Sequence, residues 1–236
     1  MFQAVPSPQQ ALRRRTRIHD STSKMSKHAC ELNFLSRSDG SALYSIGNTV
    51  ALASVNGPGE VKKFNRLYNR AYLEVSYSPS TGQSMIGERA LESVITRTVE
   101  QVILVHLHPR TAVNVTIQEM QSDGLELSTS VNAACLSLLD AGVQMKSTFA
   151  AVTCCLTPSS TILIEPTAAE MKESVAVATF VLDGQALNVL SAHQEGCLNA
   201  ENFNACLKAC QTAAKDVFNF YRQALEKKYH TCNEIS

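Results

Sequence analysis

The sequence predicts an α+β domain made of two similar halves, each with strands followed by helix. Short apolar segments that alternate like strands are separated by turn residues, and longer segments carry apolar residues three and four positions apart, as in amphipathic helices. This order of strands and then helix occurs twice along the 236 residues. The chain is 44% hydrophobic with a mean hydropathy of −0.06, so it is long and apolar enough to bury a sizeable core.

The first half is expected to contain five strands and two helices. Turn signals such as Ser38-Asp39-Gly40 separate its early strands. Apolar residues at helical spacing predict the first helix, and a near-continuous apolar segment predicts a second, buried one. In chain order we expect strands at 28–35, 41–47, 48–57 and 72–77, a helix at 88–107, a strand at 111–120 and a helix at 128–141.

The second half is expected to repeat the pattern with four strands and one long helix. Asp183-Gly184 predicts a tight turn between the last two strands. The final helix is predicted to be amphipathic, because residues such as Phe203, Leu207 and Tyr221 fall on one face. We expect strands at 150–156, 161–165, 175–182 and 186–191, and the helix at 199–228.

Charge is distributed unevenly along the chain. Residues 1–27 hold six basic residues and one acidic residue, a net +5, which leaves 15 basic and 20 acidic residues, a net −5, for the remainder. We predict a disordered basic arm at 1–27, a folded domain at 28–230 and a flexible tail at 231–236. The arm fits a nuclear address, an RNA-contacting tail, a transit peptide or a plain solvated tail. A slightly acidic body argues that any RNA contact is local.

Composition also limits the partners and cofactors. No apolar run reaches the roughly 18 residues of a membrane span, so no membrane partner is expected. Aromatic residues make up 6% of the chain and Trp is absent, which argues against an aromatic platform for nucleic acid. Cys206 and Cys210 have the spacing of half a metal site, but buried hydrophobic cysteines are the favoured interpretation, and no cofactor is expected.

Three segments carry a family resemblance. They read LHPRTAVNV at 107–115, SDGLELSTSVNAACLSLLDAGVQMK at 122–146 and ILIEPTAAEMKE at 162–173. They resemble the RNase PH family, which comprises phosphorolytic exoribonucleases and their relatives in the eukaryotic exosome ring. The resemblance covers nearly the whole predicted domain. It implies a duplicated βαβα unit of the ribosomal protein S5 domain-two type, and assembly into a hexameric ring around a channel.

The resemblance also places the family's site residues on this chain, and the side chains there have changed. Leu127 stands where active members carry a phosphate-binding Arg, and leucine offers neither charge nor donor. Glu165 and Met171 stand at two Asp positions, and Met171 provides neither a hard-metal ligand nor a general acid. Glu165, Glu170 and Glu173 are weak candidates for a metal, and a solvated acidic loop is the favoured interpretation.

RNA contacts are reduced in the same way. Thr96 falls where active members carry an RNA-binding Arg, with Arg97 beside it. A second basic cluster precedes the strand at 72–77, and a solvated basic loop is an equally good interpretation of it. The RNA-binding candidates are Lys62, Lys63, Arg66, Arg70 and Arg97.

The resemblance therefore implies a non-catalytic structural subunit of the exosome ring. Such a subunit supports 3′–5′ RNA processing and degradation, including rRNA maturation and mRNA turnover, by a separate nuclease. Its expected partners are other RNase PH-like ring subunits, cap subunits with RNA-binding domains and RNA in the channel, in the nucleus, nucleolus and cytoplasm. The alternative is a metal-dependent nuclease that acts on RNA or DNA in its own right, with a homodimer as one form that it could take.

Overall fold

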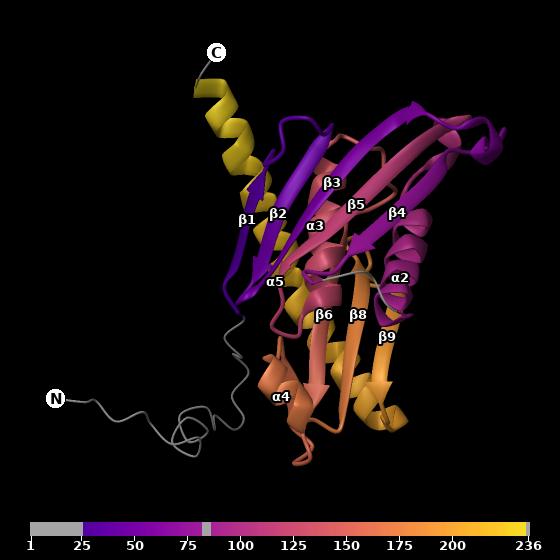
Figure 1. Ribbon diagram of the computed structural model, residues 1–236. Helices are drawn as coiled ribbons and strands as arrows, with labels where there is room; N and C mark the ends of the chain where they lie inside the picture. Colours follow the sequence, from indigo (N-terminus) through magenta and orange to yellow (C-terminus); the bar gives the residue numbers. More distant parts are fainter. Residues whose placement is uncertain (1–25, 82–85, 235–236) are drawn as a thin grey trace.

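The protein folds as two β-sheets with helices packed between and beside them (Figure 1). This computed structural model describes residues 26–81 and 86–234, with side chains up to Tyr229. The predicted arm at 1–27 therefore falls outside the described residues except for its last two. Within the described part of the chain, we find no helix long and apolar enough to cross a membrane.

The first sheet has the order β1-β2-β3-β5-β4. Every neighbouring pair is antiparallel except β4 and β5, which run parallel. A parallel pair needs a crossover, and helix α2 provides it. The elements are β1 (His28–Leu32), β2 (Gly40–Ile46), β3 (Thr49–Glu60), β4 (Tyr72–Ser78), α2 (Ile86–Val102) and β5 (Thr111–Gln121).

The second sheet has the order β7-β6-β8-β9, and all its pairs are antiparallel. It thus lacks the parallel pair of the first half. Its elements are β6 (Phe149–Leu156), β7 (Ile162–Ile164), β8 (Ala176–Asp183) and β9 (Val189–Gly196), with helices α4 (Ala168–Glu173) and α5 (Ala200–Glu234). The predicted fold class and the division into two strand–helix halves are confirmed.

Helix α3 (Glu126–Asp140) forms the centre of the molecule because it packs against both sheets. Every side chain from Leu127 to Leu138 is buried, which explains its near-continuous apolar sequence. Asn132 is held by Ala151 of β6: its amide donates to the Ala151 carbonyl at 3.0 Å and accepts from the Ala151 N–H at 2.7 Å. These bonds satisfy a buried polar side chain and tie α3 to the second sheet.

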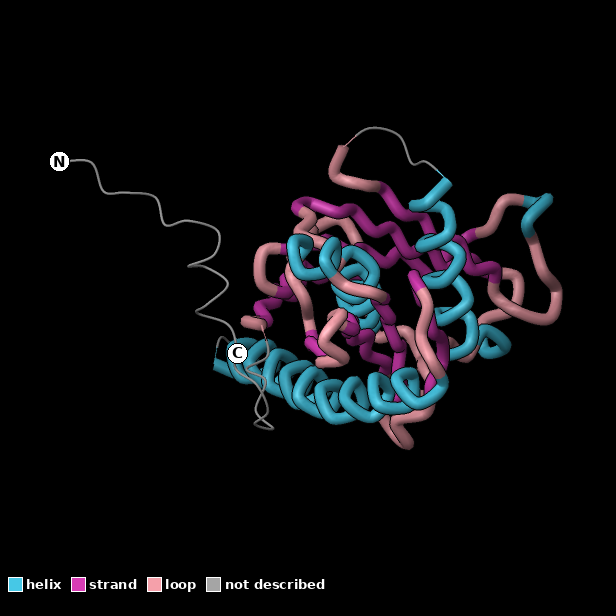
Figure 2. The backbone as a smooth tube through the Cα atoms, turned by 90° about the horizontal axis from the view of Figure 1, so that it is seen from below, coloured by secondary structure: helices cyan, strands magenta, loops and turns pink. Residues whose placement is uncertain are grey.

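Helix α5 lies along one side of the body and contacts strands of both sheets (Figure 2). Its buried face is small and apolar, with Cys206, Cys210, Ala214, Val217 and Tyr221 in the core. The same helix was expected to end at Lys228, and its backbone continues to Glu234 because no Gly or Pro interrupts it. The predicted tail at 231–236 is therefore helical as far as residue 234.

Other elements also differ from the prediction. Helix α2 ends at Val102, because Ile103 leaves the helix and forms an isolated bridge with Met145. Strand β9 begins at Val189, because residues 184–188 form a longer turn in which the Leu187 N–H bonds to the Asp183 carbonyl. The acidic segment expected to be a loop contains helix α4, which starts with a capping box made by Thr167 and Glu170.

Candidate functional site: a closed phosphate position

The turn from β5 into α3 carries the position expected to bind phosphate. Gly124 has a positive φ of +95°, and Leu125 opens the helix without a side-chain cap. Leu127 is 6% exposed and belongs to the core. Glu126 places a carboxylate in the first helical turn, where it accepts a hydrogen bond from the Ser122 hydroxyl. The start of α3 therefore presents a negative side chain next to the position where the resemblance predicts a phosphate-binding Arg.

Helix α4 packs directly on this turn. A Cβ atom added to Gly124 would lie 3.0 Å from the Met171 sulfur and 3.1 Å from the Ala168 Cα atom. Met171 is partly buried against the core. The fold thus brings Leu127 and Met171 to the same neighbourhood, as the resemblance implies, but fills it with apolar side chains.

Glu165 is buried, and its carboxylate lies against Ser26 and His28. Its carboxylate accepts a hydrogen bond from the Ser26 backbone N–H at 2.8 Å, and Oε1 lies 3.1 Å from His28 Nε2. Glu165 has a φ of +53°, a conformation that costs a non-glycine residue about 1–3 kcal/mol and persists only where its surroundings enforce it. The expectation of a solvated acidic loop is wrong for this residue, because its carboxylate bridges β7 and β1.

The two other acidic candidates, Glu170 and Glu173, have different surroundings from Glu165. Glu170 accepts bonds from the Thr167 N–H at 2.9 Å and the Thr167 hydroxyl at 3.0 Å, so it caps α4. Glu173 is exposed at the end of that helix. Across residues 26–81 and 86–234, no group of three or more His, Cys, Asp or Glu side chains is arranged to hold a metal ion.

A buried polar chain continues from Glu165 into the core. His28 Nδ1 lies 2.8 Å from the Tyr44 hydroxyl, which in turn lies 3.5 Å from the Asn132 amide. His28 Nε2 approaches Glu165 closely without the alignment of a good hydrogen bond. Burial, and then the Glu165 charge, raise the pKa of Tyr44 well above its usual value. The sequence did not lead us to predict these buried polar contacts. An Asn in an apolar helix and a His at the start of an apolar strand were the available signals.

An acidic cleft of about 340 Å³ opens beside the start of α3. Tyr77 donates a 2.7 Å hydrogen bond to the buried carboxylate of Glu119, and burial followed by this bond raises the pKa of Tyr77. Among the described side chains that line the cleft, His193 is the one base. Because like charges repel, this cleft disfavours phosphate and RNA. Its carboxylates are Glu88, Glu119, Glu126 and Glu195.

The basic candidates lie elsewhere, on the β3–β4 loop that projects from one end of the first sheet (Figure 1). Lys62, Lys63 and Arg66 are exposed, whereas Arg70 pairs with Glu100 of α2 at 2.9 Å. Arg97 is exposed three residues before Glu100, so the Arg70 pair brings the loop toward the side of α2 that carries Arg97.

The same loop exposes aromatic rings. Phe64 is 81% exposed and Tyr68 is 78% exposed, between the basic residues. The composition argued against an aromatic platform for nucleic acid, and that expectation stays a prediction. Overall composition could not reveal the exposure of these two rings, because it counts residues without placing them.

Comparison with known proteins identifies the family. A profile described as the 3′ exoribonuclease family, domain 1 (RNase PH), matches residues 25–144. The chain belongs to the RNase PH family. The match spans Leu127 and ends before Glu165 and Met171, and the alignment of all three with the family's site residues stays a prediction.

Individual RNase PH relatives agree. An Arabidopsis thaliana protein named exosome complex exonuclease RRP46 homolog is 30% identical over 216 residues, covering 84% of this chain and 90% of the relative. A Caenorhabditis elegans protein named exosome complex component RRP46 homolog is 30% identical over 203 residues, covering 84% and 93%. The crystal structure of rice Rrp46 superposes with a TM-score of 0.83 at 26% identity, covering 88% of this chain and 98% of that one.

Proposed function

We propose that this chain is a non-catalytic structural subunit of an exosome ring built from RNase PH-like subunits, of the type named RRP46 in its relatives. The observation that carries the proposal is the buried Leu127 at the phosphate position, with Glu126 beside it. A site that has lost its cation and gained a carboxylate does not hold a phosphate dianion. The chain then supports 3′–5′ RNA processing by a separate nuclease.

An assay of the purified chain tests the absence of catalysis. Single-stranded RNA labelled so that 3′ shortening is resolved is incubated with and without phosphate, and with Mg²⁺, Mn²⁺ or EDTA. We expect no cleavage in any condition. Phosphate-dependent release of nucleoside diphosphates would contradict the argument from Leu127. Metal-dependent cleavage without phosphate that is lost in Glu165→Ala, under conditions where that variant stays folded, would establish the nuclease alternative instead.

Ring membership has a separate test. Co-expression with the other RNase PH-like subunits should yield a stable hexamer that includes this chain, together with cap subunits. The isolated chain exposes the surfaces that face its neighbours, so we infer that it self-associates when alone. A chain that stays monomeric and enters no ring would refute the structural role, whatever its catalytic behaviour.

RNA contact is assigned to the β3–β4 loop. Stacking of a base on an exposed aromatic ring contributes about 1–3 kcal/mol, and each lysine–phosphate contact changes the salt dependence of single-strand binding by about 0.7 in log–log slope. Phe64→Ala should therefore weaken binding to oligouridylate at least fivefold without changing the salt slope. Lys63→Ala should flatten that slope. Phe34, an aromatic residue exposed on another loop, provides the matched control. Equal losses in Phe34→Ala and Phe64→Ala would remove the loop from the RNA path.

A further inference from the structure

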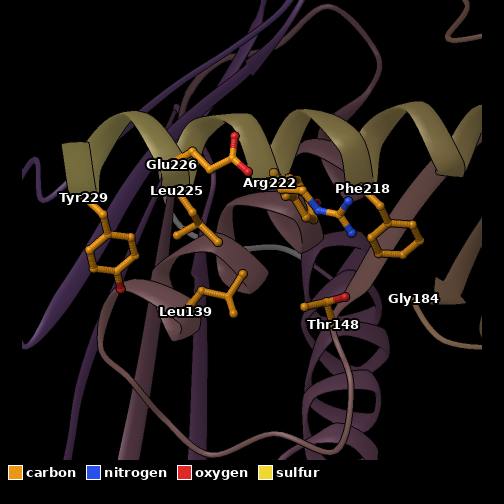
Figure 3. A pocket seen from close by; sticks show the side chains of 9 residues that line it. Leu139, Thr148, Gly184, Phe218, Arg222, Leu225, Glu226 and Tyr229 are labelled. Carbon is orange, nitrogen blue, oxygen red and sulfur yellow. The ribbon is translucent and has the colours of Figure 1, made fainter. Parts of the chain in front are cut away.

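A groove of about 440 Å³ lies where α5 leaves the body, at the end of α3 remote from Leu127 (Figure 3). Leu139 of α3 is 12 residues from Leu127, about 18 Å along a helix, so the groove is distinct from the closed phosphate position. The body contributes Leu139, Thr148 and Gly184. Helix α5 contributes Phe218, Tyr221, Arg222, Leu225, Glu226 and Tyr229.

A salt bridge between α5 and the body borders the groove. The Asp140 carboxylate has an exposed fraction of 2%, accepts the Ser41 backbone N–H at 3.0 Å and pairs with Lys228 of α5. Tyr221 is the last residue of α5 that is buried, among the side chains described as far as Tyr229. The helix beyond Tyr221 is therefore fixed to the body at Lys228 with little packing before it, and the groove is the space between.

The lining combines an apolar floor with polar groups that lack partners. Leu139 and Leu225 project into the groove from opposite sides, and Tyr229 is 59% exposed at one end (Figure 3). Within the described residues, the Arg222 guanidinium and the Thr148 hydroxyl have no hydrogen bond or ion pair. Figure 3 shows the guanidinium above Thr148, so a cation and a hydroxyl face the same space beside the apolar floor.

We propose that this groove is a docking site for a peptide segment of another protein, one that presents an acidic side chain to Arg222 and, about one helical turn away, an apolar side chain to Leu139, Leu225 and Tyr229. Glu226 also lines the groove, but Figure 3 shows its carboxylate on the side of α5 away from Leu139 and Thr148, whereas the Arg222 guanidinium lies on their side. Charge complementarity therefore sets the acid at Arg222, because an exposed guanidinium beside a hydroxyl accommodates a carboxylate. The groove volume falls in the range of ligand sites, about 300–1,000 Å³, and suits a few side chains. Segments that lie in grooves through a few anchors at helical spacing are a common recognition mode.

Peptide display on the full chain tests this inference. A library of random 16-residue peptides is selected on the wild type and counter-selected on the double variant Arg222→Glu/Tyr229→Ala. Both residues are exposed, so the variant should keep the wild-type melting temperature, which is checked first. Enriched peptides should carry an acid one turn from an apolar residue and bind the wild type about tenfold more tightly than Arg222→Glu.

Charge exchange makes the test specific. Replacing the peptide acid with Lys should weaken binding to the wild type and restore binding to Arg222→Glu. Failure to enrich peptides, enrichment without acids, or equal binding to the double variant would overturn the proposal. Concentration-dependent self-association that Tyr229→Ala abolishes would overturn it too, because the occupant would then be a second copy of this chain. None of these outcomes depends on ring membership or on RNA binding.

Discussion

The closed phosphate position and the β3–β4 loop differ in how far their apolar side chains are exposed to solvent. At the first, the side chains expected to meet phosphate are apolar: Leu127 is buried and Met171 is partly buried. At the second, Phe64 and Tyr68 are aromatic and largely exposed. Apolar side chains are thus withdrawn from solvent at the first position and presented to solvent, among basic residues, at the second.

This difference teaches that buried and exposed apolar side chains in the same chain need different explanations. Enclosed apolar residues stabilise the fold, since burial of apolar area is favourable. Exposed rings cost stability or solubility unless a partner covers them. The enclosed region therefore has a structural explanation, and the exposed loop needs a functional one, which supports the proposed RNA contact.

The largest effect is expected from placing a cation at the closed phosphate position. Leu127→Arg should destabilise the protein by several kcal/mol, roughly 3 or more, because a charge enters the core with Glu126 as its nearest compensation. It should not create phosphorolysis, since Met171 also occupies the site. Urea denaturation and the phosphate-dependent assay measure the two effects.

Leu127→Met is the control, because a swap that conserves volume costs less than about 1.5 kcal/mol. A stable Leu127→Arg protein that releases nucleoside diphosphates would show that the position is open and the acid site intact.

Removing Glu165 sharpens the comparison by testing whether its carboxylate is structural. Glu165→Ala leaves the Ser26 N–H without its acceptor and removes the carboxylate beside His28 Nε2, and an unsatisfied buried polar group costs about 1–3 kcal/mol. Chemical denaturation should show this loss. The exposed Glu173→Ala is the matched control and should change stability by less than about 0.5 kcal/mol. Equal stability of the two variants would contradict the structural role.

The enclosed thiols predict a pH effect. Burial raises the pKa of Cys135 to about 12. A thiol whose pKa is higher when folded than when unfolded, about 8.5, stabilises the protein below the unfolded pKa, and this contribution is lost as the pH rises from about 8.5 toward 12. The loss reaches about 1.4 kcal/mol per pH unit for one thiol.

Unfolding free energies between pH 8 and 10.5 measure this loss. Cys135→Ala should show a shallower decline than the wild type, and Cys197→Ala, at an exposed cysteine, should not. Parallel curves for the wild type and Cys135→Ala would refute the enclosure of this thiol.

The smallest expected effect concerns the helix cap. Glu170→Ala removes one half of the capping box of α4, which should cost about 1 kcal/mol and loosen Met171 from Gly124. Thermal unfolding provides the measurement. Glu170→Gln, which keeps an acceptor, should retain most of the stability, and a loss as large as in Glu170→Ala would point to the charge in place of the cap.

The fold could be predicted well where periodicity decided it. The buried helix α3 and the amphipathic α5 followed from the spacing of their apolar residues, whereas α4 did not, because six residues are too few to show a helical period. The end of α2 was misplaced because Ile103 continues the apolar pattern while its backbone pairs with Met145. Local pattern cannot report such a long-range pairing.

Some features of the candidate site could likewise be predicted from the sequence, and others could not. The nature of Leu127 and Met171 was evident from the sequence, because the identity of a side chain limits its chemistry wherever it lies. The role of Glu165 was not, because it depends on His28 and Ser26, which are far away in sequence. The expected nuclear, nucleolar and cytoplasmic location stays a prediction.

Helix α5 has a consequence for how this protein is made in the cell. Among the described elements it follows every strand in the chain, and it packs against β1, the first of these strands, as well as against β6, β7 and β8. Until it leaves the ribosome, the apolar faces that it covers stay uncovered, and a nascent chain in that state aggregates readily. Messages truncated before residue 200 should therefore yield insoluble products that depend on chaperones, and the two sheets become a finished core only once α5 has emerged and packed against them.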